Sequence, residues 1–223
     1  MRIPKPAAVL FDLDGTLLDS APDFYRLLNQ MRTERGLPRI DEQKLRQQIS
    51  NGATAMIQSA FDLDAEDPTC GPLRLQLLDL YEQSPAQESR LFEGMEALLH
   101  WLETQQIPWG IVTNKPECFS LPILRQLDLE TRCSTLICPE QVEQNKPHPE
   151  GLLRACALLG CQPQQSIYVG DHHRDIEAGI NAGMLTIAAC YGYLTPEDRP
   201  DDWNADHQVD SPQQLLDWLQ GPV

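Results

Sequence analysis

Short apolar runs alternate with longer amphipathic segments along most of the chain. The apolar runs lie at residues 7–11, 107–113, 134–138, 166–170 and 185–189. Apolar residues at helical spacing fill residues 94–105, 116–127, 149–160, 174–183 and 211–220. Strands that alternate with helices predict parallel βαβ units. Because the runs are apolar throughout, we expect helices to cover both faces of the sheet, which gives a three-layer α/β domain.

One long region breaks this alternation. Residues 19–88 contain no convincing strand, and Phe24, Leu27, Leu28 and Met31 recur at helical spacing. Further helical segments are expected at 41–49, 52–61 and 70–83. A parallel crossover needs only about a dozen residues, so this region is too long to be one. We therefore predict an inserted all-helical cap at 19–88 and a core made of residues 1–18 and 89–223.

Charge and cysteine content narrow the class of protein. The 223 residues include 17 Lys plus Arg and 33 Asp plus Glu, for a formal net charge of −16. Such an acidic chain is not expected to bind nucleic acid or an anionic membrane surface. The first apolar run is too short for a signal peptide. The seven cysteines form no C-x-x-C pair, which favours free thiols over a zinc site and predicts a cytoplasmic protein.

Polar side chains follow the apolar runs, at the points where the predicted strands end. They are Asp12, Asp14, Thr113, Asn114, Asp171 and Asp175, together with Lys146 before a later helix. Ligands of open parallel sheets bind at the carboxyl ends of the strands. Each residue alone has an ordinary explanation as a turn or a helix cap. Their recurrence at successive strand ends is far less expected by chance, so we interpret them as one site.

The residue types in this set indicate phosphoryl chemistry. Carboxylate and carbonyl oxygens select a hard cation, of which Mg²⁺ is the usual choice. Such a cation would pair carboxylates that are otherwise costly to bury. An aspartate can attack phosphorus to form an aspartyl-phosphate. Phosphoryl transfer needs charge stabilisation around the phosphoryl oxygens, which Thr113, backbone N–H groups and Lys146 can supply.

The same residues carry a resemblance to a known family. The stretch FDLDGTLLD at 11–19 resembles the first motif of the haloacid dehalogenase superfamily. Thr113-Asn114, Lys146-Pro147 and the segment 170–175 resemble its second, third and fourth motifs. The resemblance spans essentially the whole chain. It implies a haloacid dehalogenase-like Rossmannoid core with a parallel sheet and an inserted helical cap.

The resemblance also implies roles for the acidic residues. Asp12 is expected to be the nucleophile. Asp14 is expected to protonate the leaving alkoxide and then to deprotonate the attacking water. The Asp12 carboxylate, the backbone carbonyl of Asp14 and Asp171 are expected to hold Mg²⁺, with Asp175 supporting the metal shell.

The remaining motif residues are expected to act on the phosphoryl group. Thr113, Asn114 and Lys146 are the expected phosphate-binding residues. His172 is a mild departure from the family, whose members often carry a smaller or acidic residue there. We interpret His172 and His173 as loop residues.

Several activities within the superfamily are less compatible with this sequence. Dehalogenases lack the second aspartate of the first motif, which Asp14 supplies here. A phosphonate hydrolase needs a cap lysine that forms a Schiff base, and the cap has only Lys44, with no clear apolar pocket. A non-catalytic binding protein would be expected to lose Asp12, Asp14 or Asp171. A phosphomutase stays open as an alternative.

The expected substrate is a small phosphorylated sugar or acid. The cap type resembles that of phosphoglycolate phosphatases and their sugar-phosphate relatives. The closer resemblance is to the family of N-acetylmuramic acid 6-phosphate phosphatases, which act in peptidoglycan recycling, and it lies in segments 49–61, 91–99 and 191–206. This resemblance implies N-acetylmuramic acid 6-phosphate as the substrate, with phosphoglycolate or another small sugar phosphate as the alternative. Only the last of these segments separates the two families clearly.

The cap is expected to recognise the rest of the substrate. Both candidate substrates carry a carboxylate besides the phosphate, and arginine matches a carboxylate through paired N–H donors. Arg46 is the candidate partner, with the Asn51-Gly52 turn facing the core. Alternatively, Arg46 lies on a solvated helix face.

Overall fold

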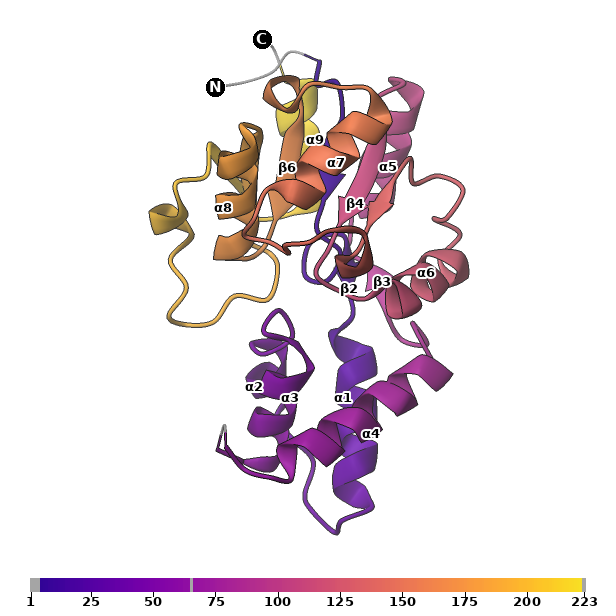
Figure 1. Cartoon of the computed structure of the whole chain (residues 1–223), viewed down its shortest axis with the longest axis vertical. Coiled ribbons are helices and arrows are strands. Elements are labelled where there is room, and N and C mark those ends of the chain that lie inside the picture. Colours follow the sequence, from indigo (N-terminus) through magenta and orange to yellow (C-terminus); the bar gives the residue numbers. More distant parts are fainter. Residues whose placement is uncertain (1–4, 65, 222–223) are drawn as a thin grey trace.

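Two groups of elements lie one below the other along the long axis of the molecule (Figure 1). The computed structural model describes residues 5–64 and 66–221. Residues 1–4 and 222–223 of the expected core, and residue 65 of the expected cap, lie outside the described residues. A layered α/β unit forms the upper part of this view, and a group of helices lies below it.

The α/β unit is built on one six-stranded parallel sheet with the strand order β5-β4-β1-β6-β7-β8. The strands are β1 (Val9–Phe11), β4 (Trp109–Val112), β5 (Leu136–Ile137), β6 (Ile167–Gly170), β7 (Leu185–Ala189) and β8 (His207–Val209). Five of them fall in the five apolar runs. The edge strand β8 was not expected, because only Val209 in it is buried and its sequence lacks an apolar run.

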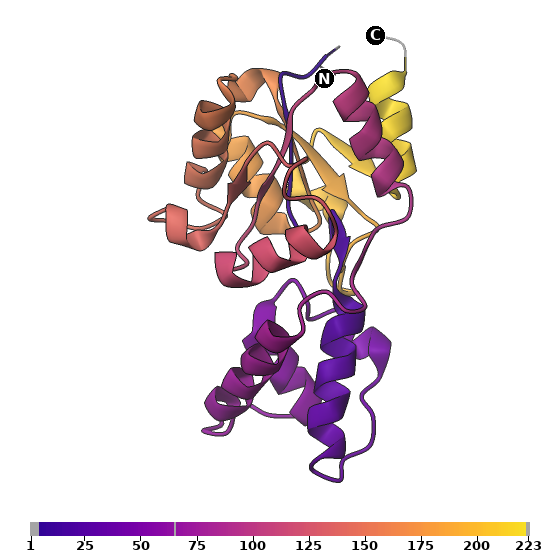
Figure 2. The ribbon, with the colours of Figure 1, turned by 90° about the vertical axis from the view of Figure 1, so that its right-hand side faces the viewer.

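Helices cover both faces of this sheet, as the continuous apolar runs predicted. Figure 2 shows α5 (Met95–Thr104) and α9 (Pro212–Gln220) side by side on one face, with α7 (Glu150–Leu159) and α8 (His173–Ala182) on the other. The remaining helices of this unit are α6 (Glu117–Gln126) and the short 3₁₀ helices η1 (Pro139–Gln141), η2 (Pro163–Gln165) and η3 (Pro200–Trp203). The expected α/β class with a parallel sheet is confirmed.

In the described part of the chain between the first and second strands of the large sheet, the second group consists of four helices. They are α1 (Ala21–Thr33), α2 (Glu42–Arg46), α3 (Gly52–Phe61) and α4 (Cys70–Gln83). The two chain passages that lead to this group pair as an antiparallel ribbon, β2 (Leu18–Asp19) with β3 (Arg90–Leu91). The apolar stripe of α1 is buried, with Leu28 and Met31 fully enclosed. None of the described helices has the length and hydrophobicity needed to cross a membrane.

Candidate active site

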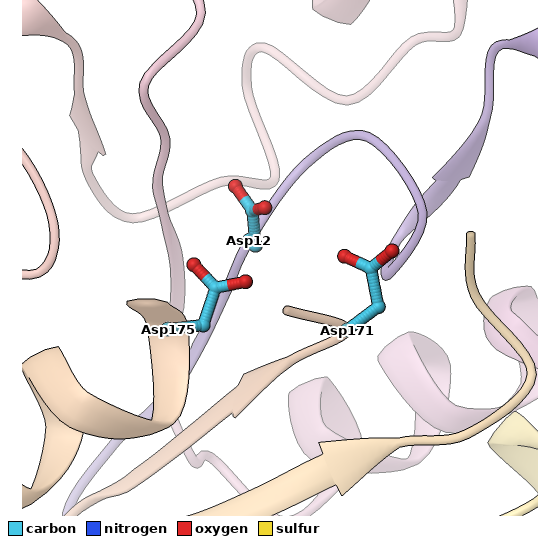
Figure 3. A group of neighbouring side chains, drawn as sticks. All are labelled: Asp12, Asp171 and Asp175. Atoms are coloured by element: carbon cyan, nitrogen blue, oxygen red, sulfur yellow. The ribbon is translucent and has the colours of Figure 1, made fainter. Parts of the chain in front are cut away.

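Three buried carboxylates meet at the carboxyl ends of two adjacent strands (Figure 3). Asp12 follows β1, Asp171 follows β6, and Asp175 lies in the first turn of α8. One oxygen from each lies within 4.8 Å of those of the other two. Because β1 and β6 are neighbours in the sheet, residues about 160 positions apart in sequence come into one cluster.

Lys146 is the cation that faces this cluster. Its Nζ lies 2.8 Å from Asp12 Oδ1 and 2.7 Å from Asp175 Oδ1, and it donates hydrogen bonds to the Val112 carbonyl and the Tyr168 hydroxyl. Burial by itself lowers the pKa of Lys146, but the Asp12 and Asp175 carboxylates more than reverse this, so its pKa is raised. Lys146 is therefore a permanent positive charge. One ammonium group cannot balance three carboxylates.

Asp171 shows the resulting excess of negative charge. It accepts hydrogen bonds from Thr16 Oγ1 at 3.2 Å, Ser50 Oγ at 3.1 Å and the Tyr193 backbone N–H at 2.9 Å. Even so, burial raises the pKa of Asp171 to about 7, and the neighbouring Asp175 and Asp12 charges add to the rise. The site thus requires a further proton or a further cation.

The cluster fits a hard divalent cation. Among the described residues, Asp12 Oδ1 is buried and accepts no hydrogen bond, because the Lys146 ammonium pairs with it by charge rather than by a well-directed hydrogen bond. An all-oxygen donor set with surplus negative charge is what Mg²⁺ prefers. We conclude that Asp12 and Asp171 have the chemistry to hold such an ion, with Asp175 beside them.

Two glycines let the backbone approach Asp171 closely. Gly15 has a positive φ of +86°, and a Cβ there would lie 2.1 Å from Asp171 Oδ2. A Cβ on Gly192 would lie 2.3 Å from Asp171 Cβ. No larger residue fits at either position without moving this carboxylate. The glycine of the first motif is thus required by tertiary contact as well as by the turn.

The side chain of Asp14 points to a different partner. Lys115 Nζ lies 3.0 and 3.1 Å from its two carboxylate oxygens, and Ser20 Oγ donates a hydrogen bond to it at 2.5 Å. The same ammonium donates to the Tyr81 hydroxyl of α4 at 2.9 Å and lies 4.7 Å from the centre of the Tyr81 ring. Burial lowers the pKa of Lys115, but Asp14 and Tyr81 outweigh it and raise that pKa overall. Asp14 is therefore held by a cation that also contacts the helical group.

Thr113 and Asn114 lie at the end of β4, as expected. The Thr113 hydroxyl is buried and accepts a hydrogen bond from the Lys115 backbone N–H at 3.1 Å. The Asn114 side chain donates to the Lys146 carbonyl at 3.1 Å and accepts from the Lys146 N–H at 3.2 Å. Its amide thus holds the Lys146 segment in place, and the residue also lines the cavity, so its expected role in phosphate binding stays a prediction.

A cavity of about 420 Å³ lies between this site and the helical group, and residues of both line it. Its floor includes Asp12, Asp14 and Thr113 at the strand ends. Its walls come mainly from α1, α3, α4 and α6 and include Phe24, Asn51, Gly52, Ala53, Thr54, Met56, Arg74, Leu78, Tyr81 and Phe119. The structure therefore places Asn51 and Gly52 on the cavity wall.

The expectation for Arg46 is corrected by the structure. Arg46 does not line the cavity. Its Nη1 lies 3.0 and 3.1 Å from the carboxylate oxygens of Asp19 in β2, and its guanidinium lies 4.9 Å above the Tyr193 ring. Asp19 is the nearest carboxylate and takes up this charge. Arg46 thus ties α2 to the ribbon that leads into the helical group.

His173 is the first residue of α8 rather than a loop residue, whereas His172 lies in the loop that directly precedes this helix. His172 is the N-cap of that helix and accepts a hydrogen bond from the Arg174 N–H at 3.2 Å. Burial, with the positive charge of Arg174, lowers the pKa of His172 to about 4, so the ring is neutral. His173 is exposed and lies 3.8 Å from Glu177.

Sequence reasoning missed several residues that the fold brings to the cavity. Lys115 directly follows Thr113 and Asn114, so its position at a strand end was a usable signal. Arg174 lies between Asp171 and Asp175, and its Nη2 donates a hydrogen bond to the Ser50 carbonyl. The other missed residues are Ser50, Arg74 and Tyr81. They come from the helical group, and no pattern in the sequence indicates that they face the core.

The chain is similar to known proteins over nearly its full length. The family described as haloacid dehalogenase-like hydrolase matches residues 9–189. An N-acetylmuramic acid 6-phosphate phosphatase of Pseudomonas aeruginosa is 47% identical over 98% of this chain and 97% of its own. A phosphoglycolate phosphatase of Xanthomonas campestris is 46% identical over 96% of both chains. The crystal structure of a predicted phosphoglycolate phosphatase from Haemophilus somnus superposes with a TM-score of 0.81, at 28% identity over 96% of this chain and 98% of that one.

Proposed function

The chain belongs to the haloacid dehalogenase-like hydrolases, and we propose that it is a phosphatase that hydrolyses N-acetylmuramic acid 6-phosphate with Mg²⁺ as its cofactor. The observation that carries the proposal is the meeting of Asp171 and Lys146 with Asp12, which lines a cavity. The near full-length similarity to a phosphatase of this sugar phosphate supports the choice of reaction and substrate.

In the first half of the proposed reaction, Asp12 is the nucleophile. A carboxylate oxygen of Asp12 forms a bond to phosphorus, and the bond between phosphorus and the sugar oxygen breaks. Asp14 donates its proton to the departing alkoxide, which leaves as N-acetylmuramic acid. The products of this step are an aspartyl-phosphate at residue 12 and an ionised Asp14.

In the second half, Asp14 acts as a base. It takes a proton from a water molecule whose oxygen attacks phosphorus. The bond between phosphorus and the Asp12 oxygen then breaks and inorganic phosphate leaves. Asp12 returns as a carboxylate and Asp14 as a carboxylic acid. Asp14 carries this proton only while substrate is bound, because the structure pairs its carboxylate with Lys115.

Charge stabilisation comes from the residues around the phosphoryl group. Lys146 supplies a fixed positive charge beside Asp12, and the Thr113 hydroxyl supplies a hydrogen bond. Bound Mg²⁺, held by Asp12, the Asp14 backbone carbonyl and Asp171, would neutralise part of the charge on the phosphoryl oxygens. Asp175 orients Lys146 through their ion pair at 2.7 Å. Asn114 contributes by fixing the Lys146 backbone.

We further propose that residues 19–88 form a cap over this site and select the substrate. The cavity of about 420 Å³ is large for the two-carbon phosphoglycolate but lies within the range of pockets that bind a sugar-sized ligand. Because other relatives are named phosphoglycolate phosphatases, phosphoglycolate is the second candidate substrate.

All seven cysteines are free thiols, which supports a reducing compartment such as the cytoplasm.

The test is phosphate release by the purified protein in Mg²⁺. We expect kcat/KM for N-acetylmuramic acid 6-phosphate to exceed that for phosphoglycolate. Asp12→Asn should abolish turnover, because an amide is not a nucleophile for phosphorus. The reverse substrate order would select the second candidate. Near wild-type turnover by Asp12→Asn would reject the mechanism.

A further inference from the structure

The cavity is cationic although the protein is strongly acidic. Three positively charged residues line it, namely Arg74, Lys115 and Arg174, and only two acidic residues do, Asp12 and Asp14. The chain as a whole carries a net charge of −16. A local reversal of this kind raises the concentration of anionic ligands in a cleft. The cavity is therefore suited to a ligand with more negative charge than a phosphate alone.

Two of these three cations already have partners. Lys115 pairs with Asp14, and Arg174 donates to the Ser50 carbonyl. Arg74 is different: within the described part of the chain it has no hydrogen bond, ion pair or ring contact. An arginine that lines a cavity without a partner has its paired N–H donors available for a ligand.

The position of Arg74 along α4 sets its distance from the reacting group. Arg74, Leu78 and Tyr81 follow one another at spacings of four and three residues, so they share one face of the helix, and all three line the cavity. Tyr81 marks the catalytic end, since its hydroxyl contacts Lys115 beside Asp14. At 1.5 Å per residue, Arg74 lies about 10 Å further along the helix.

We propose that Arg74 binds a carboxylate of the substrate on the side of the molecule remote from the phosphate. In N-acetylmuramic acid 6-phosphate, the lactyl group on O3 and the phosphate on O6 are separated by four carbons of the sugar, C3 to C6. In phosphoglycolate the carboxylate and the phosphate are joined by a single carbon, which is too short to reach from Asp12 to Arg74. The position of Arg74 on α4 thus selects substrates by the distance between their phosphate and their carboxylate. This inference rests on the proposed function and specifies how the substrate is selected.

The part of the cavity wall that α3 provides reinforces the attraction for an anion. The first turn of the ten-residue helix α3, with Asn51, Gly52, Ala53 and Thr54, lines the cavity. The N-terminal end of a helix carries partial positive charge. Asp12 and Asp14, the two acids that line the cavity, are paired with lysines at its floor. Nothing on the described cavity wall therefore competes with a substrate carboxylate for Arg74.

The experiment compares two substrates that differ only in the lactyl group. N-acetylglucosamine 6-phosphate has the same ring and phosphate as N-acetylmuramic acid 6-phosphate but no carboxylate. Arg74→Ala should raise KM for the muramic acid substrate roughly tenfold and leave kcat nearly unchanged, because a charged hydrogen bond is lost far from the reacting atoms. KM for the glucosamine substrate should not change. Arg74→Lys should give a smaller rise, because it keeps the charge but not the paired donors.

Arg39→Ala is the matched control. Arg39 is an exposed arginine of the same helical group that lies over the Tyr25 ring and does not line the cavity. It should leave both KM values unchanged. If Arg74→Ala shifts both substrates equally, or neither, the inference is overturned while the proposed function stands. If the wild-type protein hydrolyses neither substrate, the proposed function itself fails.

Discussion

Lys115 joins the expected general acid and base to the helical group, and this contact can be tested by removing its charge. Lys115→Met keeps an unbranched side chain that is one atom shorter, removes the charge, and leaves Asp14 with Ser20 as its remaining partner. The side chains of Lys115 and Asp14 are only 9% and 19% exposed. At their separation of 3.0 Å, Coulomb's law gives roughly 5 kcal/mol for an effective dielectric constant of about 20. Part of this energy offsets the cost of removing both charges from water.

Removing one partner of such a pair therefore costs about 3–5 kcal/mol, because the other charge is left buried. For a chain of this length each kcal/mol corresponds to about 2–4 °C, so Lys115→Met should lower the melting temperature by roughly 6–20 °C. In an Asp14→Asn background there is no carboxylate to leave unpaired. The same substitution then loses only the hydrogen bond to the Tyr81 hydroxyl and the contact with the Tyr81 ring, and should lower the melting temperature by no more than about 3 °C.

The assay is thermal unfolding of the wild type, both single variants and the double variant, without substrate. Lys44→Met is the matched control, because the Lys44–Asp62 pair has a similar distance of 2.7 Å but is exposed. It should hardly move the melting temperature. Equal losses from Lys115→Met in both backgrounds would refute the reasoning, since the lysine would then act through packing rather than through Asp14.

Three further predictions concern the charges at the floor of the cavity. Asp14→Asn should lower kcat about 10²–10⁴-fold and leave Mg²⁺ affinity largely unchanged, since its expected metal ligand is a backbone carbonyl; steady-state kinetics and a Mg²⁺ titration check this. Lys146→Arg should keep more phosphatase activity than Lys146→Ala, which leaves Asp12 and Asp175 without a cation; equal inactivity would mean that contact geometry matters more than charge. The raised pKa of Asp171, about 7, predicts a pH-dependent effect of Mg²⁺. In the metal-free protein, Asp171 stabilises the folded state fully below its unfolded pKa, and this contribution is lost as pH rises through about 7. Because Mg²⁺ binds the ionised carboxylate, adding Mg²⁺ should raise the melting temperature more at about pH 8 than at about pH 5.5. A rise that does not depend on pH would contradict the assignment.

The sequence by itself determined the parallel α/β core and which residues end its strands. A strand buried on both faces must be apolar along its whole length, so residues 7–11 and 166–170 were recognisable without the structure. Once those strands are parallel neighbours, Asp12 and Asp171 must follow them at the same edge of the sheet. The edge strand β8 escaped detection because only Val209 in it is buried, so its sequence contains no apolar run.

Only the tertiary structure decided which side chains of the helical group face the site. Arg46 and Arg74 are both arginines on helices of that group, and their local sequences do not distinguish them. Arg46 meets Asp19 of the connecting ribbon, while Arg74 shares a helix face with Tyr81 and lines the cavity. Lys115 contacts Asp14 from about 100 positions away and Tyr81 from about 30. Helical periodicity identifies a buried face, but the partner that buries it depends on how the helices pack against the core.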